Sequence, residues 1–209
     1  DVTCKKLGIE NKKADLAPWE KIVYDIKNPQ AEVKIAVVGK YVELKDAYIS
    51  INESLEHAAY SLGYKARIKY IQAENLDVES LKEYQGILVP GGFGNRGVEG
   101  KIAAIKYARE NKIPFLGICL GMQLAVVEFA RNVLGYTDAN SSELDENTTH
   151  PVIHIMEDQK YIEKMGGTMR LGAYPCILGD GTLAKELYES KEISERHRHR
   201  YLSLIHISE

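Results

Sequence analysis

One segment of this chain could hold a reactive cysteine at a sharp turn. An apolar run after Pro114 leads to Cys119, with Gly117 and Gly121 two residues away on either side. Glycines at this spacing are typical of a strained turn from a buried strand into a helix, which lifts the central side chain out of the core. The sulfur would then lie at a helix N-terminus, where free N–H groups and the helix dipole favour the thiolate. A core cysteine does not need flanking glycines, so we predict that Cys119 is a nucleophile.

The composition is typical of a globular chain without a strongly charged partner. Of its 209 residues, 44% are hydrophobic, which is enough for a substantial core. The net charge of −3 gives no reason to expect nucleic acid or a membrane surface as a partner. Three cysteines at unrelated spacings suit neither a disulfide framework nor a zinc site. We therefore expect no metal site and a reducing, cytoplasmic location.

Strands and helices are expected to alternate from residue 33 onward. The apolar run at 33–38 predicts a buried strand, and the helical spacing over 51–62 predicts a helix, with Asp46 as its N-cap and Gly63 as its stop. Further strands are expected near 67–71, 86–89 and 115–117, and a second helix near 102–108. This alternation predicts an α/β fold with an open, doubly wound, mostly parallel sheet and helices on both faces.

A sheet of this kind binds its ligands at the carboxyl ends of its strands. Gly39, the segment 90–92 and Cys119 all fall at such ends. Beyond Asn140 the pattern becomes irregular, with strands expected at 152–156 and 171–178 and a short helix beginning after Thr182. Residues 1–31 are polar and are expected to form a linker.

Two motifs resemble those of the class I (triad) glutamine amidotransferases, which release ammonia from glutamine. They are Pro-Gly-Gly-Phe-Gly-Asn-Arg-Gly at 90–97 and Gly-Ile-Cys-Leu-Gly-Met-Gln at 117–123. Segments 140–143, 166–172 and 195–201 further resemble the CTP synthase branch of that family. By this resemblance, residues 1–31 end a synthetase domain and its linker, 32–201 form part of an amidotransferase domain, and 202–209 match nothing.

The resemblance implies a role for each residue of a glutamine site. Cys119 would attack the side-chain amide of L-glutamine and form a γ-glutamyl thioester. The backbone N–H groups of Gly92 and Leu120 would form the oxyanion hole. The remaining glutamine-binding residues would be Glu143 for the ammonium, Arg200 for the carboxylate and Gln123 in the pocket wall.

The resemblance also implies partners outside this part of the chain. A synthetase domain of the same chain would bind ATP and UTP, with Mg²⁺, and GTP would activate the full-length enzyme, expected to be a homotetramer. No cofactor is assigned to residues 1–209 themselves.

The sequence departs from the family at the general base. Triad amidotransferases supply it from a His-Pro-Glu segment, whereas His150 and Pro151 are followed by Val152 and precede Arg200. Residues after Tyr201 no longer resemble the family. We therefore expect an amidotransferase domain that is incomplete at its C-terminal end and turns over glutamine poorly.

Other interpretations stay open. The basic run at 196–200 is, by itself, most typical of a solvated charged segment, and segment 90–94 of a tight turn. The chain could also derive from another class I amidotransferase or a γ-glutamyl hydrolase. A third possibility is a catalytically silent regulatory module that binds glutamine.

Overall fold

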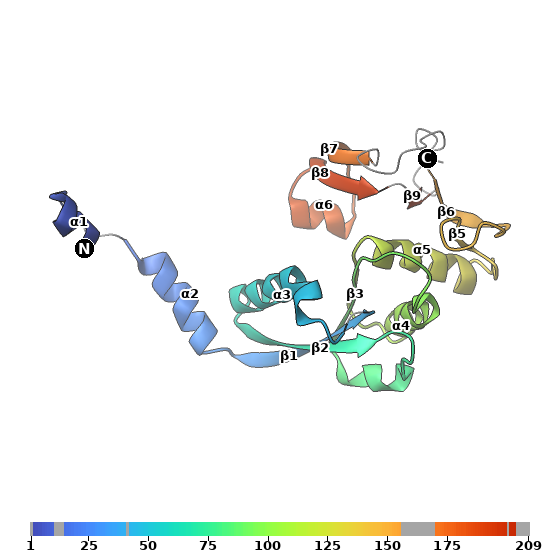
Figure 1. Cartoon of the computed structure of the whole chain (residues 1–209), viewed down its shortest axis with the longest axis horizontal. Helices are drawn as coiled ribbons and strands as arrows, with labels where there is room; N and C mark the ends of the chain where they lie inside the picture. Colours follow the sequence, from blue (N-terminus) through green and yellow to red (C-terminus); the bar gives the residue numbers. More distant parts are fainter. Residues whose placement is uncertain (1, 11–14, 41, 156–169, 200, 204–209) are drawn as a thin grey trace.

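A four-stranded parallel sheet forms the centre of the molecule (Figure 1). The computed structural model describes residues 2–10, 15–40, 42–155, 170–199 and 201–203. In chain order the strands are β1 (Ala31–Gly39), β2 (Tyr64–Gln72), β3 (Gly86–Val89) and β4 (Phe115–Gly117). They lie side by side in the order β2-β1-β3-β4, with every pair parallel. The predicted α/β fold with a parallel sheet is confirmed.

Helices cover both faces of this sheet. They are α3 (Ile49–Ser61), α4 (Val98–Glu110) and α5 (Leu120–Asn132), with 3-10 turns η1 (Lys45–Tyr48) and η2 (Val78–Glu83). Alternate residues of a strand point to opposite faces. Ile87 and Val89 of β3 therefore pack in one core cluster with residues of α4 and α5, whereas Leu88, between them, is buried on the other side. The apolar core thus packs against the strands whose carboxyl ends carry the predicted site.

The start of α3 differs from the prediction. Asp46 is not its N-cap, because it lies inside η1, where its carbonyl oxygen accepts a hydrogen bond from the Ile49 N–H. Tyr48 precedes the helix without a capping side chain. The predicted stop at Gly63 is confirmed: its φ is +76°, and its N–H donates to the Tyr60 carbonyl oxygen at 3.0 Å.

The N-terminal residues contain two helices that the sequence analysis did not predict. These are α1 (Val2–Leu7) and α2 (Ala17–Lys27), which extend away from the sheet in Figure 1. α2 exposes several apolar side chains, among them Trp19 and Tyr24. The division of the chain at residue 31 stays a prediction.

The C-terminal part is built from short strands, as predicted. β5 (Asn140–Ser141), β6 (Pro151–Ile155) and β9 (Tyr201–Ser203) form one small sheet, and β7 (Arg170–Ile177) pairs with β8 (Glu192–His199). Between β7 and β8 lies α6 (Leu183–Tyr188), whose N-terminus is capped by the Thr182 side chain. Across the described residues, every helix is too short or too polar to cross a membrane.

Candidate active site

The turn predicted at Cys119 is present between β4 and α5. Cys119 has φ 55° and ψ −108°, a backbone conformation that non-glycine residues rarely adopt. The turn is held in place by its neighbours: the Ile118 N–H donates to the Val89 carbonyl oxygen at 3.0 Å, and the Gln123 N–H donates to the Cys119 carbonyl oxygen at 3.1 Å. The half-buried thiol therefore occupies a fixed position at the carboxyl end of β4.

Close backbone packing explains both flanking glycines. A Cβ atom on Gly121 would lie 2.0 Å from the Val89 carbonyl oxygen, and one on Gly117 would lie 2.6 Å from the Gly121 carbonyl carbon. Both distances are far inside van der Waals contact. The absence of a side chain at Gly121 thus lets the turn pack against β3, and its absence at Gly117 lets the start of α5 pack against β4.

The loop after β3 places a second backbone donor at the sulfur. A Cβ atom on Gly91 would lie 3.2 Å from the Cys119 Cβ and 3.8 Å from its Sγ, so the loop and the thiol are in direct contact. The N–H groups of Gly92 and Leu120 both hydrogen-bond to this sulfur. An oxygen anion formed on a carbon bound to Sγ would lie near the same donors, as an oxyanion hole requires.

The thiol is not activated in the way the sequence analysis expected. Burial raises the pKa of Cys119, and the nearby Glu143 carboxylate raises it further. The N–H groups of Leu120 and Gly92 lower that pKa, as expected for a helix N-terminus, but they do not outweigh burial. The prediction that position alone favours the thiolate was therefore wrong, because it left out desolvation.

Glu143 reaches the site from the loop after β5. Its backbone N–H donates to the Ser141 hydroxyl at 3.2 Å, and its carboxylate is close enough to influence Cys119. Asn95 ties this loop to the loop after β3, because its side-chain amide donates to the Leu144 carbonyl oxygen at 3.1 Å. Glu143 is thus held in a loop that is tied to the loop carrying Gly92.

Gln123 lies one turn after the nucleophile and is 5% exposed. Its side-chain nitrogen donates to the Tyr201 carbonyl oxygen at 3.0 Å, which fixes the start of β9 against α5. Arg200, the predicted partner of the substrate carboxylate, lies outside the described residues, as do residues 166–169 of the 166–172 motif and His206.

Two buried lysines lie next to the loop after β3, residues 90–94, called the glycine loop below, and neither was predicted from the sequence. Lys40 follows β1, is 7% exposed and donates its ammonium to the carbonyl oxygens of Phe93 and Gly94. Lys101 lies in α4 and is 1% exposed. The signal for Lys101 was its spacing of three residues from Val98 and four residues from Ile105, which puts a lysine on the buried stripe.

The two histidines before β6 and within it have partners away from the thiol. His150 pairs with Asp138 at 2.6 Å, and His154 lies 2.8 Å from the Ser142 hydroxyl. Their positions supply no base to Cys119 in this arrangement.

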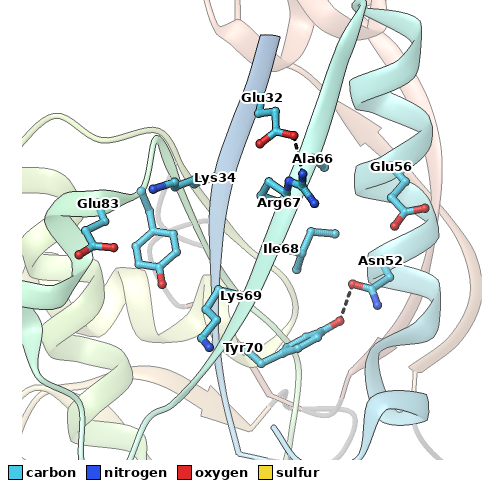
Figure 2. Close-up of a pocket in the computed structure, with 11 residues that line it drawn as sticks. Glu32, Lys34, Asn52, Glu56, Ala66, Arg67, Ile68, Lys69, Tyr70 and Glu83 are labelled. Carbon is cyan, nitrogen blue, oxygen red and sulfur yellow. Dashed lines mark hydrogen bonds and ion pairs between the residues drawn. The ribbon is translucent and has the colours of Figure 1, made fainter. Parts of the chain in front are cut away.

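A hollow of about 660 Å³ on the edge strand β2 is separate from this site (Figure 2). Two pairs of its polar side chains are engaged with one another: Arg67 pairs with Glu32 at 2.6 Å, and the Tyr70 hydroxyl donates to Asn52. None of its lining residues belongs to the glycine loop or to the turn at Cys119. The candidate active site therefore remains the one at the carboxyl ends of β3 and β4.

Comparisons with known proteins agree with this geometry. The family model "Glutamine amidotransferase class-I" matches residues 43–204. A CTP synthase of Clostridium beijerinckii is 58% identical over 205 residues, and one of Methanocaldococcus jannaschii is 58% identical over 207. These matches cover 96% and 94% of this chain but only 38% of each relative.

A solved structure described as the glutaminase domain of Trypanosoma brucei CTPS, with bound acivicin, has the same fold. It is 42% identical, covers 84% of this chain and 70% of its own, and superimposes with a TM-score of 0.76. The chain belongs to the class I glutamine amidotransferase family.

Proposed function

We propose that this chain is the glutamine-hydrolysing part of a CTP synthase, which supplies ammonia for the ATP-dependent amination of UTP to CTP. The relatives at 58% identity carry that name, and the solved neighbour is a glutaminase domain. The chain spans 38% of the length of those relatives, so the synthetase reaction would take place on a part of the protein outside these residues.

The observation that carries the proposal is the strained Cys119 with two N–H donors at its sulfur. As a thiolate, Cys119 would attack the side-chain amide carbon of glutamine and form a tetrahedral intermediate. The N–H groups of Gly92 and Leu120 would stabilise its oxyanion. Collapse to the γ-glutamyl thioester breaks the C–N bond, and the departing nitrogen takes up a proton and leaves as ammonia. Water then hydrolyses the thioester to glutamate and returns the Cys119 thiol.

Substrate binding would use charges at both ends of glutamine. We assign the substrate ammonium to Glu143, which faces the sulfur, and the carboxylate to Arg200, because a guanidinium donates two parallel hydrogen bonds to a carboxylate. Gln123 would hold the strand that follows Arg200 through its bond to Tyr201.

The remaining partners follow from the proposed parent enzyme. ATP, UTP and Mg²⁺ would be held by the synthetase domain, and we assign none of their ligands to the described residues. GTP activation and a homotetramer belong to the same proposal.

The proposal is tested by labelling with acivicin, followed by mass spectrometry of the cysteine peptides. We expect the Cys119 peptide to be labelled, because only this cysteine lies at a strained turn with two backbone donors. Cys4 and Cys176 in the same sample are matched internal controls.

Glutamine should protect Cys119 from acivicin, and Cys119→Ser should abolish labelling. Equal labelling of all three cysteines would contradict an assembled glutamine site. Selective labelling with no glutamine hydrolysis after addition of the relatives' C-terminal segment would favour the silent glutamine-binding module instead.

A further inference from the structure

Lys101 is a lysine buried at a position where the fold calls for an apolar residue. It lies in the first turn of α4, on the helix face that buries Val98, Ile102 and Ile105, and it is 1% exposed. Burial of an ammonium group is costly unless a carboxylate or other acceptor compensates for lost hydration. Within the described part of the chain, no carboxylate forms an ion pair with Lys101.

The charges around Lys101 increase this cost. Burial and the nearby Lys40 ammonium lower the pKa of Lys101 to about 8. Beyond Lys40 lies Arg96, paired with Glu74 at 2.7 Å.

On the α5 side of α4, the charged groups are already paired. Glu128 binds Arg109 at 2.8 Å, and Arg131 binds Glu99 at 3.0 Å. The Glu128 and Glu99 carboxylates of α5 and α4 are therefore engaged by arginines and do not pair with Lys101.

The Lys101 ammonium lies close to the loop that carries Gly92. A Cβ atom built on Gly92 would lie 3.9 Å from the Lys101 Nζ, so the ammonium lies against the residue whose N–H reaches the Cys119 sulfur. Lys40 binds the next two carbonyl oxygens of the same loop, those of Phe93 and Gly94. Two buried cations thus lie next to the loop that forms one side of the predicted oxyanion hole.

We propose that Lys101 is a positioning residue for glutamine hydrolysis, whose buried positive charge behind Gly92 favours both the Cys119 thiolate and the oxyanion of the tetrahedral intermediate. It touches neither the substrate nor the sulfur. It acts through the loop and through the local electrostatic potential, which is large in a poorly hydrated site.

This inference rests on the proposed function, but its test needs no turnover of glutamine. The rate at which iodoacetamide alkylates Cys119 is measured from pH 6 to pH 10 in the 209-residue chain, by mass spectrometry of the Cys119 peptide. This neutral reagent reports the thiolate fraction. The variant Lys101→Met removes the charge and keeps most of the side-chain volume. Lys106→Met, in the same helix and only partly buried, is the matched control.

We expect Lys101→Met to slow alkylation about fivefold at pH 7, where Lys101 is charged in the original chain. Near pH 10, where Lys101 has lost its proton, the two rates should converge. Lys101→Arg should restore the rate at pH 7, because it restores the charge. Lys106→Met should follow the original profile throughout.

Folding is followed separately by circular dichroism. Because Lys101→Met removes a buried uncompensated charge, its melting temperature should equal or exceed that of the original chain. The proposal is overturned if the alkylation rate of Lys101→Met equals that of the original chain at every pH. It is also overturned if alkylation of Lys101→Met is slowed equally at pH 7 and pH 10, because that result indicates a packing role. Acivicin labelling of Cys119 in Lys101→Met is measured as well. Selective labelling shows that the glutamine site is still assembled, so the proposal for Lys101 can fail while the proposed function stands. Were Cys119 of the original chain no more reactive toward acivicin than Cys4 and Cys176, both proposals would fall.

Discussion

At the scale of single residues, the site combines strain with opposing charges. The backbone of Cys119 lies in a sparsely populated region, which costs roughly 1 to 3 kcal/mol. The close packing of Gly121 against β3 and of Gly117 against the first turn of α5 maintains this conformation, with two N–H donors at the sulfur. Strain is thus part of the construction of the site.

Glu143 has two opposing effects in this arrangement. Its carboxylate raises the pKa of the Cys119 thiol, so it disfavours the nucleophile in the absence of substrate. An ammonium group of glutamine bound at Glu143 would cancel that negative charge. Substrate binding would therefore increase the thiolate fraction at the moment when it is needed.

Glu143→Gln should therefore have opposite effects on two reagents. Alkylation of Cys119 by neutral iodoacetamide at pH 7 should become about threefold faster, because the nearby negative charge is gone. Labelling by acivicin should become slower, because its amino-acid ammonium loses a partner. Both rates are measured by mass spectrometry of the Cys119 peptide.

Glu146→Gln, in the same loop and also exposed, is the control and should change neither rate. If both reagents slowed equally with Glu143→Gln, the loop would have moved, and the assignment of Glu143 to the substrate ammonium would be wrong.

At the scale of elements, regular periodicity made most of the fold predictable. The strands β1, β3 and β4 and the helices α4 and α5 follow mainly apolar patterns, because each buries one side in the same core. Lys101 in α4 and Gln123 in α5 interrupt them. The turn at Cys119 was predictable from its glycines, which are needed for local backbone contacts.

The features that were missed depend on contacts between distant segments. The prediction that Asp46 caps α3 was wrong because Asp46 lies inside the 3-10 turn η1, which precedes the helix. The pKa direction of Cys119 was wrong because burial and Glu143 arise from tertiary packing. Lys101 resembled a surface lysine by residue type, although its spacing placed it on the core face.

The contact between α5 and β3 gives a direct test of the turn. Gly121→Ala would place a methyl group 2.0 Å from the Val89 carbonyl oxygen, so either the helix or the strand must shift. We expect a loss of about 3 kcal/mol in the free energy of unfolding, measured by urea denaturation. Selective acivicin labelling of Cys119 should be lost as well.

Gly86→Ala is the matched control in β3, because its Cβ atom would meet Ile35 and Pro114 at an ordinary 3.9 Å. This variant should keep both stability and labelling. Equal tolerance of Gly121→Ala would show that the turn does not need the close approach seen here.

At the scale of the whole molecule, the described residues assemble the nucleophile and its two backbone donors. His150 and His154 are engaged elsewhere, and His206 lies outside the described residues. The 209 residues also contain no His-Pro-Glu segment. Thiol attack and ammonia departure both require proton transfer, so an unassisted cysteine should be slow at each step.

We therefore predict that this 209-residue chain hydrolyses glutamine at least about a thousandfold more slowly than the same chain joined to the C-terminal segment of a CTP synthase relative. A fall of this size is expected because the members of a catalytic triad act as a unit, leaving only binding and oxyanion stabilisation when the base is missing. Glutamate release is measured for both proteins, with circular dichroism to establish that each is folded. His206→Ala in the unextended chain is the deciding control. If the unextended chain folds and turns over glutamine comparably, and His206→Ala abolishes that turnover, then the residues after Tyr201 carry a working base and the prediction is wrong.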